Sequence, residues 1–171
     1  MNIWKITNDK ITISNGTVSF TMVKVQGADY WIGEMPVTQE LWEAIMGNNP
    51  SHFANKPANP VEEVSCNSAL EFIKKLNEET SLNFRLSTVK EWEFAARGGS
   101  ASQGFKYPGS NILDDVCWHR YNSGMTQPVK TKLPNETGLF DMLGNVMEWC
   151  DDEVEVFDRF DKDLIKSILE K

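Results

Sequence analysis

The chain has 171 residues and a formal net charge of −8, with 40% apolar and 25% charged residues. This length is enough for one domain with a sizeable core, and the composition is ordinary for a soluble globular protein. The acidic balance argues against a nucleic-acid partner, because binding a phosphate backbone requires a basic face.

Targeting and cysteine signals are weak. The first 14 residues contain no continuous apolar run of the kind found in a signal peptide. No stretch approaches the ~20 apolar residues that a membrane span needs. Cys66, Cys117 and Cys150 are odd in number and widely spaced. We therefore expect a cytoplasmic protein with no membrane contact and no disulfide framework.

Alternation of polar and apolar residues predicts short strands in the first 33 residues. It covers residues 4–7 and 10–14, on either side of an Asn8-Asp9 turn, and continues over 17–25 and 30–33.

Helical spacing then predicts three helices. The first covers 38–46 and stops at Gly47. The second covers 65–79, and the third covers 88–97 with a capping box formed by Thr88 and Glu91. In the second helix the apolar face is predicted to consist of Ala69, Leu70, Ile73 and Leu76. We interpret 48–60 as a loop, and 100–137 as turns and brief strands.

Several motifs in a fixed order resemble those of the formylglycine-generating enzyme (sulfatase-modifying factor) family. They are PVTQELWEAIMGNNPSHF (36–53), PVEEVS (60–65), FRLSTVKEWEFAARGG (84–99), NS (122–123) and PNETGLFDMLGNVMEW (134–149). The resemblance implies an α+β fold related to C-type lectins, with little regular secondary structure, about three main helices and short antiparallel strands. It defines a domain over 1–150, with the strongest match over 20–150.

The resemblance also bears on catalysis. Oxidases of this family use two nearby cysteines, which bind copper and convert a substrate cysteine to formylglycine. Cys66, Cys117 and Cys150 lie in other motifs, so copper is not expected and we predict that all three are buried apolar residues. A non-catalytic binding or interaction module is the first hypothesis. The alternatives are an active oxidase that uses these cysteines, and a subunit of a larger assembly completed by a partner chain.

A calcium site is implied by the same resemblance. Its ligands would be the carboxylates of Asp141 and Glu148 and the carbonyls of Gly144 and Val146. Calcium accepts such mixtures of carboxylate and carbonyl oxygens. The alternative is that both carboxylates accept hydrogen bonds from turn amides without a metal.

The remaining polar candidates are interpreted as structural. His52 and His119 are the only histidines, and each is expected to be a surface residue or a hydrogen-bonded structural one. Arg85 and Arg97 are predicted to form structural ion pairs rather than to act in catalysis.

The last 21 residues, 151–171, are predicted to form an acidic amphipathic helix. They contain eight acidic and four basic side chains, and Phe157, Phe160, Leu164 and Ile168 follow helical spacing. This helix would either dock on the chain's own core or bind a protein or peptide partner.

Overall fold

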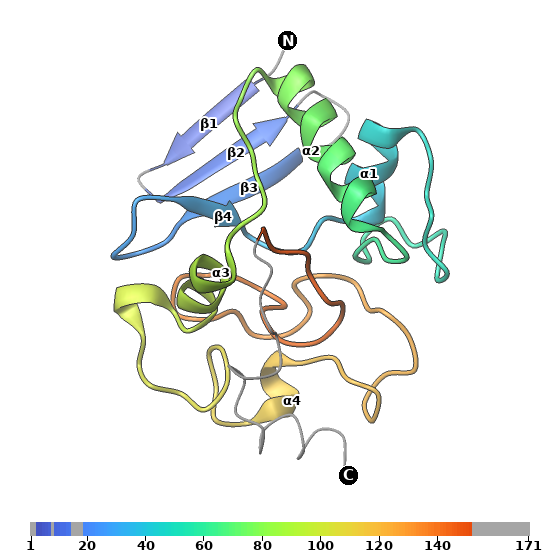
Figure 1. The fold of residues 1–171 in the computed structure, drawn as a ribbon. Coiled ribbons are helices and arrows are strands. Elements are labelled where there is room, and N and C mark those ends of the chain that lie inside the picture. The colour runs from blue at the N-terminus through green and yellow to red at the C-terminus, as the bar shows by residue number, and fades with distance from the viewer. Residues whose placement is uncertain (1–2, 8, 15–18, 152–171) are drawn as a thin grey trace.

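The fold combines a small sheet, two packed helices and a loop-rich half (Figure 1). The computed structural model describes residues 3–7, 9–14 and 19–151. Four strands form one antiparallel meander in the order β1-β2-β3-β4. Their bounds are Ile3–Thr7, Lys10–Ser14, Ser19–Lys24 and Trp31–Gly33. The strands predicted from alternation are thus confirmed, because each polar and apolar period matches the pleat of a half-buried strand.

The three predicted helices are also confirmed. They are α1 (Gln39–Met46), α2 (Cys66–Thr80) and α3 (Val89–Ala96). Each begins after a hydroxyl residue whose side chain accepts a backbone N–H bond, and α3 has the predicted capping box. Helix α1 ends at Gly47 in the left-handed conformation, with φ 75°.

The sheet has an apolar cluster on each face. Helices α1 and α2 pack together through Trp42 and Phe72, whose rings stack at 5.0 Å, and Phe20 of β3 packs against this cluster. Val23 of β3 instead joins the second cluster, with residues of α3 and Leu139. Phe20 and Val23 point to opposite faces because side chains alternate along a strand. The loop-rich half is therefore anchored to the sheet on the face away from α1 and α2.

Two details of the helix predictions are wrong. Leu70 is 48% exposed, whereas Phe72 and Leu76 are the buried residues of α2. The reason is that α1 covers the stripe centred on Phe72 and leaves Leu70 facing water. Between 100 and 137 the structure also contains a short helix, α4 (Leu113–Val116), which follows a 3-10 turn, η1 (Gly99–Ala101). A four-residue helix is too short to give a periodic signal.

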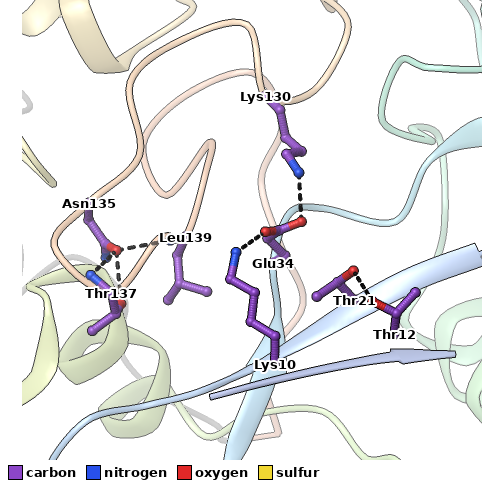
Figure 2. A network of polar contacts seen from close by, with 8 residues as sticks. All are labelled: Lys10, Thr12, Thr21, Glu34, Lys130, Asn135, Thr137 and Leu139. Atoms are coloured by element: carbon purple, nitrogen blue, oxygen red, sulfur yellow. Dashed lines mark hydrogen bonds and ion pairs between the residues drawn. The ribbon is translucent and has the colours of Figure 1, made fainter. Parts of the chain in front are cut away.

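Buried amide side chains replace regular secondary structure in the loop-rich half. Asn135 is 5% exposed and makes five hydrogen bonds. Its Nδ2 donates to the carbonyls of Ala95 and Ala96 at the end of α3, and its Oδ1 accepts from Thr137 and Leu139 (Figure 2). These bonds satisfy buried backbone groups that a sheet or helix would otherwise pair.

Within the described residues, no helix is long and apolar enough to cross a membrane. The predicted amphipathic helix at 151–171 lies, apart from Asp151, outside the residues that the structure describes.

Candidate functional site

The candidate site is the bend at residues 138–149, here called the site loop. Its turn is built on left-handed residues, with φ values of 55° at Asp141, 78° at Gly144 and 59° at Asn145. A Cβ at position 144 would lie 2.3 Å from the carbonyl oxygen of Trp118 and 2.5 Å from the Sγ of Cys117. Only glycine fits this position, because the loop backbone lies directly against residues 117 and 118.

Asn145 fastens the site loop to a neighbouring segment. Its backbone N–H donates to the carbonyl of Trp118 at 2.8 Å. Its side chain accepts from the N–H of Gln127 at 3.0 Å and donates to the carbonyl of the same residue at 3.0 Å. The side-chain amide of Asn145 thus pairs with the backbone of Gln127 as a neighbouring strand residue would, and this pairing fixes the site loop against residue 127.

The carboxylate of Asp141 is the buried centre of the loop. The residue is 4% exposed, and its two oxygens accept bonds from the backbone N–H of Lys130 at 2.9 Å and from Nδ2 of Asn145 at 3.1 Å. Burial raises the pKa of Asp141, and these hydrogen bonds only partly oppose that effect. Asp141 therefore makes the turn-amide bonds of the metal-free alternative.

Glu148 has an unusual environment. The residue as a whole is exposed, but neighbouring protein atoms around its carboxyl group remove hydration and raise its pKa to about 7, and the charge of Asp141 contributes to the increase. The indole of Trp92 acts in the opposite direction. Nε1 of Trp92 is itself buried without a partner at hydrogen-bond geometry within the described part of the chain. Glu148 is therefore close enough to Asp141 and Trp92 for both to influence its pKa.

A buried ion-pair network supports the loop from the sheet side (Figure 2). The side chain of Glu34 is 7% exposed and contacts the ammonium groups of Lys10 and Lys130, the latter at 2.7 Å. Burial raises the pKa of Glu34, but the hydrogen bonds from the two lysines outweigh it, so the pKa is lowered. Because Lys130 also donates its N–H to Asp141, the network connects β2 and β4 to the site loop. Sequence reasoning missed Glu34, because its partners lie 24 and 96 positions away.

The predicted calcium ligands fit the ion in kind and charge. They are hard oxygen donors, and burial raises the pKa of both Asp141 and Glu148, so a bound cation would stabilise their ionised forms. The set offers fewer oxygens than the six to eight that calcium takes, so water would have to complete it. Among the described residues, no three His, Cys, Asp or Glu side chains are grouped to hold a metal. Calcium binding stays a prediction.

The structural interpretation of both histidines is confirmed. His52 is exposed. The Nε2 of His119 bonds the carboxylate of Asp114 at 2.8 Å, and its Nδ1 accepts the N–H of Tyr121 at 3.3 Å. Both ring nitrogens of His119 are therefore engaged.

The arginine prediction is half right. Arg85 forms the predicted ion pair, with two bonds to Glu91 at 2.6 and 2.7 Å. Arg97 is exposed and makes no ion pair within the described residues, because it is the C-terminal cap of α3 and faces water.

The cysteine prediction holds for one residue of three. Cys66 and Cys117 carry free thiols. Cys117 is 2% exposed, and burial raises its pKa to about 11. Cys66 and Cys150 are only half-buried, since Cys66 is the first residue of α2 and Cys150 follows the exposed end of the site loop.

The outer side of the site loop displays apolar side chains. Met147 is 99% exposed and Trp149 is 50% exposed. The indole Nε1 of Trp149 donates to the carbonyl of Val64 at 2.9 Å, which holds the ring in place. The loop therefore presents an apolar tip, in which the ring of Trp149 is held by a hydrogen bond, next to the buried carboxylate of Asp141.

Comparison with known proteins agrees with this geometry. The model of the sulfatase-modifying factor enzyme 1-like domain matches residues 5–166. The chain is 33% identical to the chaperone protein LppX of Paenibacillus barcinonensis, over 81% of this chain and 74% of that protein. It is 33% identical to the formylglycine-generating enzyme of Streptomyces coelicolor, over 74% of this chain but 41% of the enzyme.

A solved structure gives the same result. Treponema denticola variable protein 1 is similar with a TM-score of 0.73 and 33% identity, over 84% of this chain and 77% of that one. The predicted α+β, formylglycine-generating-enzyme-like fold is thereby confirmed. The chain belongs to the sulfatase-modifying factor enzyme 1-like domain family.

Proposed function

We propose that this chain is a non-catalytic binding module that recognises protein partners with apolar segments. The observation that carries the proposal is the tip of the site loop, where the side chains of Met147 and Trp149 are exposed. The tip follows a turn that is fixed by the hydrogen bonds of Asp141 and Asn145. The ring of Trp149 is already oriented by its bond to Val64, so it loses little entropy on binding, and large aromatic groups of this kind dominate interface energies.

The thiol chemistry supports the same proposal. A nucleophilic or metal-binding cysteine must be a thiolate that substrate can reach. Cys117 lies against the site loop, with its Sγ packed against Gly144, and it is 2% exposed with a pKa of about 11. At neutral pH this thiol is protonated and covered, so it does not suit an oxidase.

Relatives are compatible with either reading, and one favours binding. LppX is named a chaperone protein, and chaperones act by binding other proteins. The formylglycine-generating enzymes share the domain, but the chain covers only 41% of the length of the Streptomyces coelicolor enzyme. The activity of the whole enzyme is therefore the competing hypothesis.

An aggregation assay tests the binding proposal. Reduced α-lactalbumin, an acidic protein that aggregates when its disulfides are cleaved, serves as the client, and light scattering is recorded with and without equimolar chain. We expect the chain to suppress scattering and Met147→Gln to lose most of this effect. Leu70→Gln is the matched control, because Leu70 is also exposed but lies on α2.

A second assay tests the oxidase alternative. The chain is incubated with a Cys-x-Pro-x-Arg peptide, copper and oxygen, and the peptide is read by mass spectrometry. We expect no aldehyde. Aldehyde formation that disappears in Cys66→Ser or Cys150→Ser would overturn the non-catalytic assignment. In the aggregation assay, equal suppression of light scattering by the wild type and by Met147→Gln would show that the site-loop tip is not part of the binding surface.

A further inference from the structure

The charges of this chain are segregated along the sequence. Residues 97–133 carry five basic and two acidic side chains, a net charge of +3, in a chain whose total is −8. Residues 151–171 carry eight acidic and four basic side chains, a net charge of −4. Opposite fields on two parts of one molecule attract each other and guide association.

The basic segment also exposes large apolar side chains around α4. Ile112 is 61% exposed, Leu133 is 55% exposed and Tyr121 is 49% exposed. Asp115 of α4 links two of them, since its N–H donates to the carbonyl of Ile112 and its carbonyl accepts the N–H of Leu133 at 2.9 Å. We call Ile112, Arg120, Tyr121, Lys132 and Leu133 the α4 face.

The cations of the α4 face are held by aromatic rings. The Nζ of Lys132 lies 4.1 Å from the centroid of the Trp118 ring, and the guanidinium of Arg120 lies 4.6 Å from that of Tyr121. Such stacking orders a long cationic side chain before any partner arrives. Binding a carboxylate there costs less side-chain entropy than binding it with a mobile lysine.

The acidic groups of the same region are already engaged. Asp114 accepts a bond from the Nδ2 of Asn122 and pairs with His119, at 2.9 and 2.8 Å. Asp115 accepts from the Oγ of Ser110 at 2.9 Å. These contacts orient the two carboxylates toward their partners but do not cancel their charge, so the positive excess belongs to residues 97–133 as a whole.

We propose that the α4 face is the docking site for residues 152–171 of the same chain. The sequence of that segment combines acidic side chains with apolar ones at helical spacing, namely Phe157, Phe160, Leu164 and Ile168. This is the chemistry that complements the apolar side chains of Ile112, Tyr121 and Leu133 and the two stacked cations, Arg120 and Lys132. The proposal is independent of the site-loop tip and of the binding function proposed for it.

The connection is long enough. Gly144 lies beside Trp118 through a parallel bridge, and Asp151 follows seven residues later, so it is within about 25 Å of the face at full extension. Residues 152–156 can span roughly 17 Å more. A helix over 157–168 would then be about 18 Å long. Asp151 itself is fixed, because its N–H donates to the carbonyl of Ser87 at 3.0 Å.

Photo-cross-linking in the full chain tests the docking site. A p-benzoylphenylalanine replaces Tyr121, and the monomer fraction is irradiated at low concentration and mapped by mass spectrometry. We expect cross-links from position 121 to peptides of 152–171. The matched control carries the same group at Leu70, which is similarly exposed on α2 and should give no such peptides.

Charge dependence supplies the second measurement. Lys132→Glu, in the chain that carries the cross-linker at 121, should lower the yield several-fold, and so should high salt. Lys74→Glu changes the net charge equally on exposed α2 and should leave the yield unchanged. Absence of 152–171 peptides at position 121, equal yields at 121 and 70, or cross-links found only between two copies would each overturn intrachain docking on the α4 face.

Discussion

Replacing Gly144 with alanine measures how tightly the site loop depends on its tertiary neighbours. The left-handed φ of 78° costs an L-residue roughly 1–2 kcal/mol. The new methyl group would also meet the carbonyl oxygen of Trp118 at 2.3 Å and Cys117 Sγ at 2.5 Å. Relieving this crowding requires a backbone shift, for which overpacking costs of about 1–3 kcal/mol are typical. The bond from Asn145 N–H to Trp118 contributes about 1 kcal/mol that is also at risk.

Gly47→Ala is the matched control, because Gly47 has nearly the same φ of 75° with no atom within 4 Å of the added Cβ. We expect Gly47→Ala to lower the free energy of unfolding by roughly 1–2 kcal/mol, and Gly144→Ala to lower it by about 3–6 kcal/mol in total. Urea unfolding followed by tryptophan fluorescence and circular dichroism gives both values. Equal losses in the two variants would refute the claim that contacts with residues 117 and 118 fix the loop.

Three further predictions concern the buried amides, acid stability and calcium. Asn135→Leu leaves two buried backbone groups unpaired, at a cost of about 1–3 kcal/mol each. In urea unfolding, this variant should therefore lose much more free energy of unfolding than the exposed Asn111→Ala. Similar losses in the two variants would contradict the stabilising role of the Asn135 side chain. The Glu91 pKa is lowered to about 2, first by Arg85, so its stabilisation is present above pH 4.5 and disappears as pH falls toward 2. The melting temperature of Glu91→Gln should therefore fall less steeply over that range, and an unchanged slope would argue against the pair. Millimolar calcium should raise the melting temperature and EDTA reverse it, because a ligand of the native state adds RT ln(1 + [L]/Kd). Glu148→Gln should abolish that shift. An unchanged melting temperature of the wild type in calcium and in EDTA would refute calcium binding and support the metal-free, hydrogen-bonded turn.

The fold could be predicted from the sequence where its determinants are local. Helix α1 is bounded by Thr38 and Gly47, and α3 begins at the capping box of Thr88 and Glu91. Each of these signals acts within four residues, so no partner segment is needed to read it. The strands were predictable for the same reason, because the period of two is a property of each segment alone. The family motifs added the order in which these elements occur.

Only the tertiary structure decided which side chains meet at the site. Glu34 pairs with a lysine 96 positions away, and Asn135 bonds the end of a helix 39 and 40 positions earlier. In a loop-rich fold, buried backbone groups must find side-chain partners, and nothing local specifies which amide will supply them. The same holds for Cys117. Its Sγ packs against Gly144, and burial raises the pKa of the thiol, so it stays protonated at neutral pH. Residue type set what each group can do, whereas burial and distant contacts decided its pKa, its accessibility and its partner.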